Sequence, residues 1–430
     1  MKILVLSKEP WNTSNSFGNT FENLFDGVNN VEIANIYCSE GDPNSKLVSR
    51  YFQINEKSLM KKILHIHSNI QASRDDIVGE EDYTDKFTYR FFSRYKSELL
   101  FIIREIFWKI IPWRFMNIDP FIKDFNPDIL YIPVYNQIYM IDIALHIKKV
   151  TNKPMVCHIT DDIYSYMPGI RDPFYYIRKY IIRKKIERII SLCNFIDTFT
   201  ELQKTVYERF FNKECKIRWK HANIDENNQL KYLTKEQSNI INIVYTGNIG
   251  GGRWNTLMEF ANIVESDNAK REEKILLSIY SANILNDKMR KQVEALKFTR
   301  FLGKILSAEV NRVQMEADIL LFVESLDEKE SKSAWLSFST KIIDYLSAQK
   351  PVIAIGYSNL ASMQYLKTNE IALVASSHKD IVDIVSKIHN NKKVLHDIVD
   401  RATFVIKKNH NKMHLQNRFY NDLKCLFDAK

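Results

Sequence analysis

Residues 243–254 of this 430-residue chain read IVYTGNIGGGRW and decide the fold assignment. An apolar run of β-forming residues ends at Thr246, a loop with three consecutive glycines follows, and Arg253 leads into a helical pattern. Glycines let the backbone approach a ligand closely, and a helix start presents N–H groups to an anion. The glycine spacing differs from the G-x-G-x-x-G of dinucleotide-binding enzymes. The stretch predicts a strand, a turn and a helix, with Gly250, Gly251 and Arg253 facing an anion.

A second stretch, SFSTKIIDYLSAQKPVIAIG at residues 337–356, has the same character. A polar loop enters a helix at Ser339 and Thr340, which are good N-cap residues, and Lys341 adds positive charge. Asp344 lies one turn further on the same side, where its carboxylate could accept hydrogen bonds from ribose hydroxyls. The structural alternative is a capped amphipathic helix with a surface Lys–Asp pair.

Short apolar runs alternate with helical patterns on both sides of these stretches. In the first half, the expected strands are 2–6, 31–37, 128–133, 154–159 and 195–200, and the expected helices are 19–25, 136–150, 173–193 and 201–211. In the second half, the expected strands are 241–245, 275–280, 298–302, 318–323, 351–355 and 371–374, and the expected helices are 254–265, 308–316, 341–348 and 378–389. The alternation predicts parallel sheets covered on both faces.

The chain is long enough for two or three domains, and its composition changes near the middle. Residues 223–238 are rich in Asn, Glu, Lys and Gln and have no apolar period, which predicts a linker. We therefore expect one α/β domain at residues 1–225 and another at 239–405. Residues 406–430 contain a helical stretch at 413–427 that we expect to cross back to the first domain.

Two basic segments account for the net charge of +9, which arises from 61 Lys and Arg against 52 Asp and Glu. Residues 90–114 carry a net +4 and residues 171–188 a net +5. Aliphatic and aromatic residues at helical spacing beside Lys and Arg are typical of helices that lie on an anionic membrane surface. The alternative is two helices packed on a sheet with basic outer faces. No nucleic-acid-binding motif accompanies the charge, so we expect no nucleic-acid partner.

The sequence predicts a cytoplasmic protein, with peripheral association with the inner membrane face as a further expectation. The longest uncharged run, residues 351–366, is 16 residues long, and the first apolar run is too short for a signal peptide. The five cysteines are far apart and form no C-x-x-C pair, so neither a disulfide framework nor a zinc site is expected. We expect no tightly bound metal and no cofactor.

The motifs together resemble a known family. YTGNIGGGRW, RFLGKI at 300–305, ADILLF at 317–322 and STKIIDYLSAQKPVIAIG are similar to the C-terminal domain of nucleotide-sugar glycosyltransferases of the GT-B fold. The nearest branch is the large retaining family, family 4-like, that builds bacterial polysaccharides. KILVLS, FNPDILYIP, PMVCHITDD, FTELQKTVYERFF and KHANID match the plan of its first half. The resemblance implies two Rossmann-like, doubly wound parallel-sheet domains that face each other across a cleft, with the acceptor bound by the first and the donor by the second.

The resemblance also assigns site residues. The donor diphosphate would be held by Gly250, Gly251, Arg253, Ser339, Thr340 and Lys341, the ribose by Asp344, and the base by the backbone near Gly303 and Lys304. His158 would face the transferred sugar, followed by Asp161 and Asp162, and Gly18 would line the donor cleft. The sequence departs from the family at the first glutamate of its conserved pair, which falls near residues 336–337 where no carboxylate stands. Glu324 is a candidate replacement.

The implied activity is metal-independent transfer of a sugar from a nucleoside-diphosphate sugar to a hydroxyl of a growing, lipid-linked surface glycan, with retention of configuration. Two alternatives stay open at this point. One is a nucleotide-sugar epimerase or hydrolase of the same fold. The other is a non-catalytic, glycosyltransferase-like partner subunit, which the missing carboxylate favours.

Overall fold

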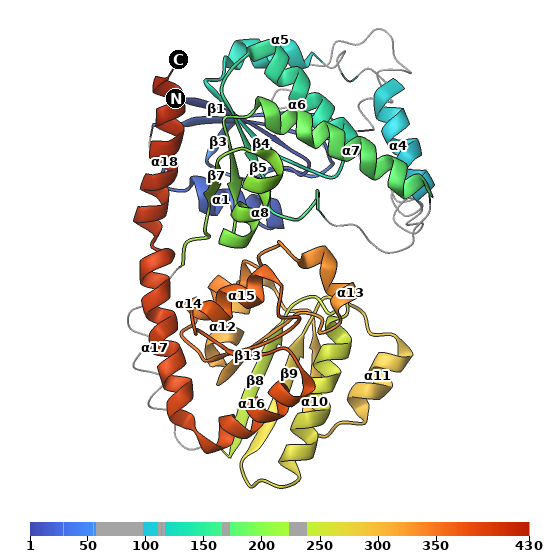
Figure 1. Cartoon of the computed structure of the whole chain (residues 1–430), viewed down its shortest axis with the longest axis vertical. Helices are drawn as coiled ribbons and strands as arrows, with labels where there is room; N and C mark the ends of the chain where they lie inside the picture. Colours follow the sequence, from blue (N-terminus) through green and yellow to red (C-terminus); the bar gives the residue numbers. More distant parts are fainter. Residues whose placement is uncertain are drawn as a thin grey trace. The chain divides into compact units, whose positions relative to one another are not determined.

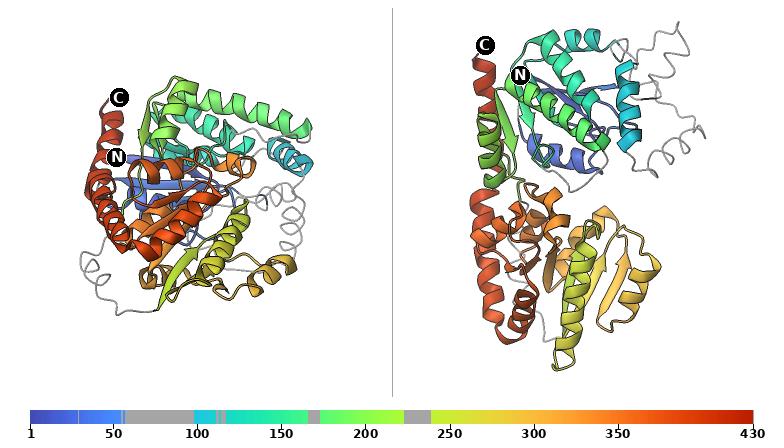
Figure 2. Two further views of the ribbon diagram at one scale, coloured as in Figure 1. Left: turned by 60° about the horizontal axis from the view of Figure 1, so that its bottom comes forward. Right: turned by 45° about the vertical axis from the view of Figure 1, so that its right-hand side comes forward.

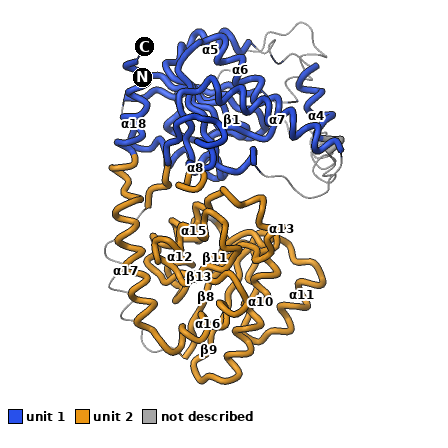
Figure 3. The backbone as a smooth tube through the Cα atoms, in the orientation of Figure 1, with its two compact units in different colours: residues 1–198, 204–217, 416–430 blue, residues 199–203, 218–415 orange. Residues whose placement is uncertain are grey.

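The computed structural model describes residues 1–28, 30–54, 56, 98–110, 113, 117–165, 173–222 and 239–429. The chain divides into two compact units, shown in Figure 3. Unit 1 comprises residues 1–198, 204–217 and 416–430, and unit 2 comprises residues 199–203 and 218–415. The expected linker, 223–238, lies outside the described residues.

Unit 1 is built on a seven-stranded, wholly parallel sheet with the order β3-β2-β1-β4-β5-β6-β7. The strands are β1 (Lys2–Ser7), β2 (Glu32–Tyr37), β3 (Val48–Gln53), β4 (Ile129–Pro133), β5 (Met155–His158), β6 (Phe195–Thr198) and β7 (Cys215–Ile217). The five predicted strands are confirmed to within two residues. The edge strands β3 and β7 were not predicted, because β3 exposes Ser49 and Arg50 and β7 has only three residues.

The helices of unit 1 surround the sheet (Figures 1 and 2). They are α1 (Ser16–Phe25), α4 (Glu98–Ile110), α5 (Ile118–Phe125), α6 (Ile138–Thr151), α7 (Pro173–Leu192), most of α8 (Glu201–Phe211) and most of α18 (Lys412–Asp428). Helix α4 packs on the helices α6 and α7. Helix α1 begins three residues earlier than predicted because the Asn15 side chain accepts a hydrogen bond from the Gly18 backbone N–H at 2.6 Å. Gly18 therefore lies in the first turn of a helix and not in a loop.

The last helix completes the core of unit 1. Phe419 of α18 packs against Phe25 with ring centroids 5.0 Å apart, and Leu423 is fully buried. Asp422 forms an ion pair with Lys216 of β7 at 2.8 Å. Residues 416–429 therefore belong structurally with the first sheet, although they follow the second in sequence.

Unit 2 contains a six-stranded, wholly parallel sheet with the order β10-β9-β8-β11-β12-β13. Its strands are β8 (Ile240–Thr246), β9 (Lys274–Tyr280), β10 (Thr299–Gly303), β11 (Ile319–Val323), β12 (Val352–Ile355) and β13 (Leu373–Ala375). Its helices are α10 (Arg253–Asn268), α11 (Asp287–Glu294), α12 (Ser307–Glu316), α13 (Glu328–Ser331), α14 (Lys341–Ser347), α15 (Ala361–Thr368), α16 (His378–Asn390) and α17 (Lys392–Asn409). All six predicted strands are confirmed to within two residues.

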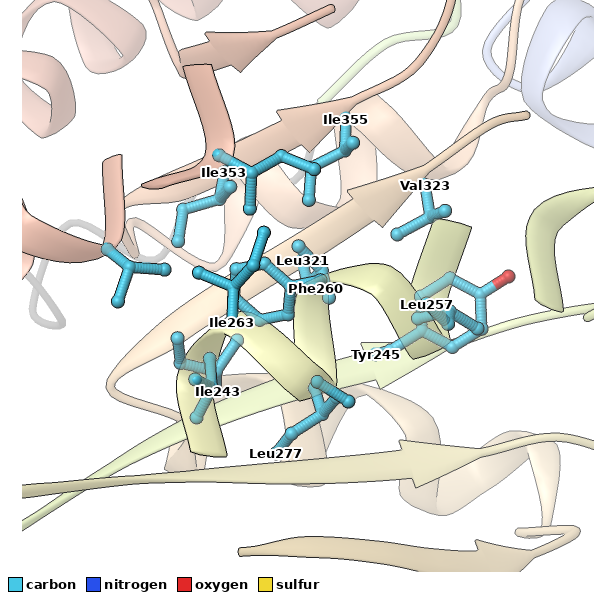
Figure 4. Close-up of a cluster of buried hydrophobic side chains, with 14 of the residues drawn as sticks. Ile243, Tyr245, Leu257, Phe260, Ile263, Leu277, Leu321, Val323, Ile353 and Ile355 are labelled. Carbon is cyan, nitrogen blue, oxygen red and sulfur yellow. The ribbon is translucent and has the colours of Figure 1, made fainter. Parts of the chain in front are cut away.

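The central strands of unit 2 bury both faces. Ile243 and Tyr245 of β8 pack into a core with α10 and α16, whereas Val244 packs on the opposite side with α14 and α17. Figure 4 shows part of the first core, with Leu257, Phe260 and Ile263 of α10 beside Leu321 and Val323 of β11. This two-sided burial explains why these strands are uninterrupted apolar runs in the sequence.

The strand order indicates where a ligand site is expected in each unit. In unit 2, β8 lies between β9 and β11, so the direction of winding reverses beside its carboxyl end. In unit 1, β1 lies between β2 and β4 in the same way. Open parallel sheets bind ligands outside the carboxyl ends of the strands at this switch point. The site is therefore expected just beyond the ends of β8 and β11.

Within the described residues, no helix has the length and apolar character needed to cross a bilayer.

Candidate functional site

Two charged side chains meet where β8 and β11 end. Glu324 follows β11 directly, and its backbone N–H donates to the carbonyl of Ile355 at 2.8 Å, which continues the ladder. Its carboxylate accepts from the Arg253 guanidinium at 2.8 and 3.0 Å. Only 11 % of the Glu324 side chain and 27 % of the Arg253 side chain are exposed. A strong, largely desolvated ion pair therefore occupies the switch point of the second sheet.

Lys341 places a second cation near this ion pair. It is the first residue of α14, and its Nζ donates to the carbonyl of Thr246 at 3.3 Å. Burial, and then the neighbouring Arg253 cation, lower the pKa of Lys341, while Glu324 and Asp344 act in the opposite direction. Two cations thus share the field of one buried carboxylate. An anion bound beside them would favour the charged form of Lys341.

The glycines of the loop after β8 are required by close packing. A Cβ at Gly247 would lie 2.2 Å from Nζ of Lys341. Gly252 has φ +78°, and a Cβ there would lie 1.9 Å from Oε2 of Glu330 and 2.4 Å from Oγ of Ser325. Gly251 also has a positive φ of +62°. The loop therefore lies directly against Lys341 and the turn that follows β11.

The start of α10 differs from the prediction. The backbone N–H of Arg253 donates to the carbonyl of Gly250 at 3.4 Å, and that of Trp254 to the carbonyl of Ile249 at 3.0 Å. The N–H of the next residue bonds the Gly252 carbonyl at 3.1 Å. These first N–H groups are occupied by the glycine turn, so the expectation that they are free for an anion is wrong. The positive charge at this end of α10 comes from the Arg253 side chain.

The start of α14 also lacks the predicted cap. Thr340 is the N-cap residue with φ −61° and ψ −18°, and its side chain makes no capping hydrogen bond. The backbone N–H of Ser339 donates to Oγ of Ser362 at 3.1 Å. Lys341, and not a hydroxyl cap, is therefore the distinctive polar group at this helix start.

Asp344 binds a residue that the sequence reasoning did not single out. Its Oδ1 accepts from Nζ of Lys220 at 2.6 Å, and 44 % of the Asp344 side chain stays exposed. The carbonyl of Lys220 accepts from Nδ1 of His410 at 2.7 Å. Because Nδ1 must then carry the proton, Nε2 accepts from the Tyr365 hydroxyl at 2.6 Å. His410 and Tyr365 thus fix the backbone that carries Lys220.

This arrangement predicts acid lability. Burial lowers the pKa of His410 to about 4 from an ordinary 6.5. Between these values the unfolded chain binds a proton that the folded chain does not, so stability falls as the pH is lowered. The loss from pH 6.5 to 4 is on the order of 3 kcal/mol. Denaturant titrations at several pH values should show this slope in the wild type and a shallower one in His410→Gln. An unchanged slope in the variant would contradict the assignment.

Gly303 and Lys304 lie at the end of β10. Gly303 has φ +74°, a backbone conformation that favours glycine, and its carbonyl accepts from the N–H of Ser281 at 2.9 Å. Lys304 is exposed. Both residues are at the carboxyl edge of the second sheet, as are Arg253 and Lys341, but no contact joins the two pairs among the described interactions.

In unit 1, His158 lies in a buried polar cluster. It ends β5 and is 1 % exposed, and its Nδ1 is 2.9 Å from the hydroxyl of Tyr131. That hydroxyl donates its proton to Oδ2 of Asp197 at 2.7 Å. In the bond between His158 and Tyr131, His158 Nδ1 is therefore the donor and the tyrosine oxygen accepts. Phe21 of α1 packs on the imidazole with centroids 5.3 Å apart. The sequence reasoning found His158 but not Tyr131 or Asp197.

The two aspartates after β5 have different surroundings. Asp162 is buried and accepts from the N–H of Ser165 at 2.9 Å and from the Tyr207 hydroxyl at 3.3 Å. Asp161 is exposed, and its carbonyl accepts from the N–H of Ile163 at 2.9 Å. Asp162 therefore holds the turn after β5, whereas the Asp161 side chain faces solvent.

Comparison with known proteins relates the whole chain to solved structures. No sequence family and no curated protein matches it. HepE of Anabaena in complex with UDP is 10 % identical with a TM-score of 0.60, over 99 % of this chain and 100 % of that one. The trehalose 6-phosphate synthase of Burkholderia multivorans is 8 % identical with a TM-score of 0.63, over 100 % and 99 %. A trehalose-6-phosphate protein from E. coli bound with UDP-2-fluoro glucose is 11 % identical with a TM-score of 0.59, over 99 % of each chain.

At these identities the likeness establishes the fold. It supports the predicted architecture of two doubly wound, parallel-sheet units, but it does not support placing the chain in the family 4-like branch. The chain has the GT-B fold.

Proposed function

We propose that the protein is a glycosyltransferase that moves a sugar from a nucleoside-diphosphate sugar to a hydroxyl group. The observation that carries this proposal is the position of two cations at the switch point of the second sheet: Arg253, paired with Glu324, and Lys341, bound to the Thr246 carbonyl. Proteins of the same fold have been solved with UDP and with UDP-glucose. We therefore assign a nucleoside diphosphate to these two cations.

The chemistry of sugar transfer suits this pair. As the bond between sugar and diphosphate breaks, negative charge grows on the leaving phosphate. Arg253 Nη2 binds Glu324 and Nη1 donates to the Gly250 carbonyl at 3.2 Å, so the remaining N–H groups of the guanidinium are those that can bind phosphate oxygens. Lys341 supplies a compact point charge in a partly buried position. Both cations are held by surrounding groups before the donor arrives, so little reorganisation is needed during the reaction. A divalent metal is not required by this scheme.

We assign the ribose of the donor to Asp344. Lys220 binds its Oδ1 and orients the carboxylate. We assign Oδ2 to a ribose hydroxyl, with the backbone near Gly303 and Lys304 contacting the base. This assignment makes Lys220 a positioning residue that acts through Asp344.

We assign the acceptor to unit 1. The proposed acceptor is a hydroxyl of a growing, lipid-linked surface glycan, and the proposed outcome is retention, both inferred from the family resemblance. His158, with Asp161 and Asp162, would face the transferred sugar, and Gly18 would line the donor cleft. The bond to Tyr131 supports a defined role for His158, because it fixes the tautomer of the imidazole. Gly18 is also needed for packing, since a Cβ there would lie 2.0 Å from the Asn12 carbonyl oxygen.

A donor screen tests the proposal. UDP, GDP, ADP and CMP sugars should be compared by thermal unfolding, since a ligand that binds only the folded state raises the midpoint. We expect one nucleotide class to stabilise the wild type and to have a much smaller effect on Arg253→Ala. Arg312→Ala is the matched control, because Arg312 is an exposed arginine of the same unit that pairs with Glu316.

Consumption of the stabilising donor then separates the reaction classes. A transferase consumes it rapidly only with an acceptor, whereas an epimerase or hydrolase consumes it alone. A non-catalytic partner leaves the donor intact under both conditions. If none of the nucleotides stabilises the protein, the assignment of a donor site is contradicted.

A further inference from the structure

Helices α4 and α7 of unit 1 each expose an apolar stripe. On α4, Ile103, Ile106 and Ile110 recur at helical spacing, and Ile110 is 72 % exposed. On α7, Ile177, Tyr180 and Ile181 form the corresponding stripe, with exposures of 56 %, 64 % and 39 %. We call these six residues the α4–α7 surface. Large apolar side chains that stay exposed along two helices of one unit indicate an interaction site.

The opposite faces of the two helices are packed. Trp108 of α4 stacks on Tyr139 of α6 with ring centroids 4.1 Å apart. Ile182 and Ile186 of α7 are fully buried. The exposed stripes are therefore the outer sides of helices whose other faces pack against the unit.

The two helices lie side by side. The Arg178 guanidinium of α7 stands over the Phe101 ring of α4 at 5.3 Å from its centroid. Figures 1 and 2 show α4 beside one end of α7 from three directions. The two stripes therefore belong to neighbouring elements of one unit.

Positive charge accompanies the stripes. Lys109 of α4 and Arg188 of α7 are exposed, and so is Lys184 of α7, which forms an ion pair with Glu187 at 2.9 Å. Lys184 and Arg188 continue the helical spacing of the α7 stripe. Arg183 donates to the carbonyls of Tyr164 and Ser165 at 2.8 and 3.2 Å. Since a carbonyl carries no net charge, these bonds position Arg183 without cancelling its charge.

Not all of the basic residues of α7 face outward. Arg178 and Lys179 are buried, Lys179 donates to the Ile163 carbonyl at 2.6 Å, and Lys185 pairs with Asp142. Much of the predicted segments 90–114 and 171–188 also lies outside the described residues, namely 90–97, 111–112, 114 and 171–172.

We propose that the α4–α7 surface binds an anionic lipid bilayer, with α7 lying along the interface. Apolar side chains beside exposed Lys and Arg match the boundary between acyl chains and anionic headgroups. A second copy of this chain is a poorer fit, because a two-fold contact would bring each basic patch against its own like charges. This proposal stands on the helices of unit 1 and does not depend on the donor site.

Vesicle sedimentation of the full chain tests the proposal. The probes are phosphatidylcholine vesicles with and without about 30 % phosphatidylglycerol, at about 50 and about 500 mM NaCl. We expect binding to the anionic vesicles at low salt, and weaker binding at high salt or without the anionic lipid. The apolar variant is Ile106→Ser, Ile110→Ser and Ile177→Ser combined, and the charge variant is Lys109→Gln, Lys184→Gln and Arg188→Gln combined.

Both variants should lose about tenfold or more in vesicle affinity while keeping the wild-type unfolding midpoint and the donor-induced stabilisation. The matched control is Ile284→Ser with Phe404→Ser, which removes two apolar side chains of unit 2 that are 93 % and 66 % exposed. It should bind vesicles as the wild type does. Absence of binding by the wild type, equal binding to neutral vesicles, or an equal loss in the control would each overturn the proposal. So would a wild-type dimer that the variants dissociate without any vesicle binding.

Discussion

Replacing Lys341 with Met should lower the rate of sugar transfer by about a hundredfold or more, the scale seen when one positioned charge-stabilising donor is removed. Methionine keeps much of the length and apolar volume of the lysine stem, so the packing of α14 should survive. The substitution removes the ammonium group that donates to the Thr246 carbonyl. It also removes the second positive charge, beside Arg253, that interacts electrostatically with Glu324. Steady-state kinetics with the donor identified by the screen measures the effect.

Lys332→Met is the control for that experiment. Lys332 follows α13 in the same unit, is exposed, and pairs with Glu328 at 3.4 Å. Its replacement should leave kcat and KM unchanged. Wild-type turnover in Lys341→Met would remove Lys341 from the diphosphate site. A loss accompanied by a lowered unfolding midpoint would instead indicate a structural role.

The second large effect is expected from the smallest substitution. Gly247→Ala places a methyl group 2.2 Å from the present position of Lys341 Nζ, with Tyr245 closing the other side at 3.1 Å. The ammonium must therefore move away from the carboxyl end of β8. Gly247 has no positive φ, so the backbone itself tolerates alanine. We expect donor affinity to fall about tenfold or more with little change in stability.

A double-mutant cycle shows whether this effect passes through Lys341. If the methyl group acts by displacing the ammonium, Gly247→Ala should have little further effect on donor affinity in the Lys341→Met background. Calorimetric titration of the four proteins with the nucleoside diphosphate gives the coupling. Strictly additive losses would show that the methyl group blocks the ligand directly or acts elsewhere.

The sheets were predictable because their central strands are buried on both faces. Residues 243–245 and 319–323 alternate between two cores, so no polar residue interrupts them and the apolar run is visible in sequence. Elements at the edge of a sheet or on the surface lack this apolar run and were not predicted. The edge strand β3 carries exposed Ser49 and Arg50, and α11 has no buried residue and hence no apolar period.

The candidate site was predictable only in its local parts. Arg253, Lys341 and Asp344 follow recognisable strand and helix boundaries, but their partners are far away in sequence. Glu324 is 71 residues from Arg253, and Lys220 is 124 residues from Asp344. Glu324 had a usable signal, because it directly follows a strand adjacent to the switch point. Lys220 lies in an irregular segment, where no spacing rule indicates its partner.

The structure also changes how the predicted anion site works. Glycine-rich turns were expected to free the N–H groups of α10, yet the turn carbonyls bind them. Glycine is needed at 247 and 252 because neighbouring side chains leave no room for a Cβ. Positive charge at the site therefore comes from the side chains of Arg253 and Lys341, and both must be present for the proposed function.

A crystal structure of the protein soaked with UDP, or with the nucleoside diphosphate that the screen selects, tests the central claim most directly. The proposal predicts diphosphate oxygens within hydrogen-bonding distance of the Arg253 guanidinium and of Lys341 Nζ, beside the carboxyl ends of β8 and β11. A nucleotide bound elsewhere on the chain, with no phosphate oxygen within hydrogen-bonding distance of Arg253 or Lys341, would contradict it.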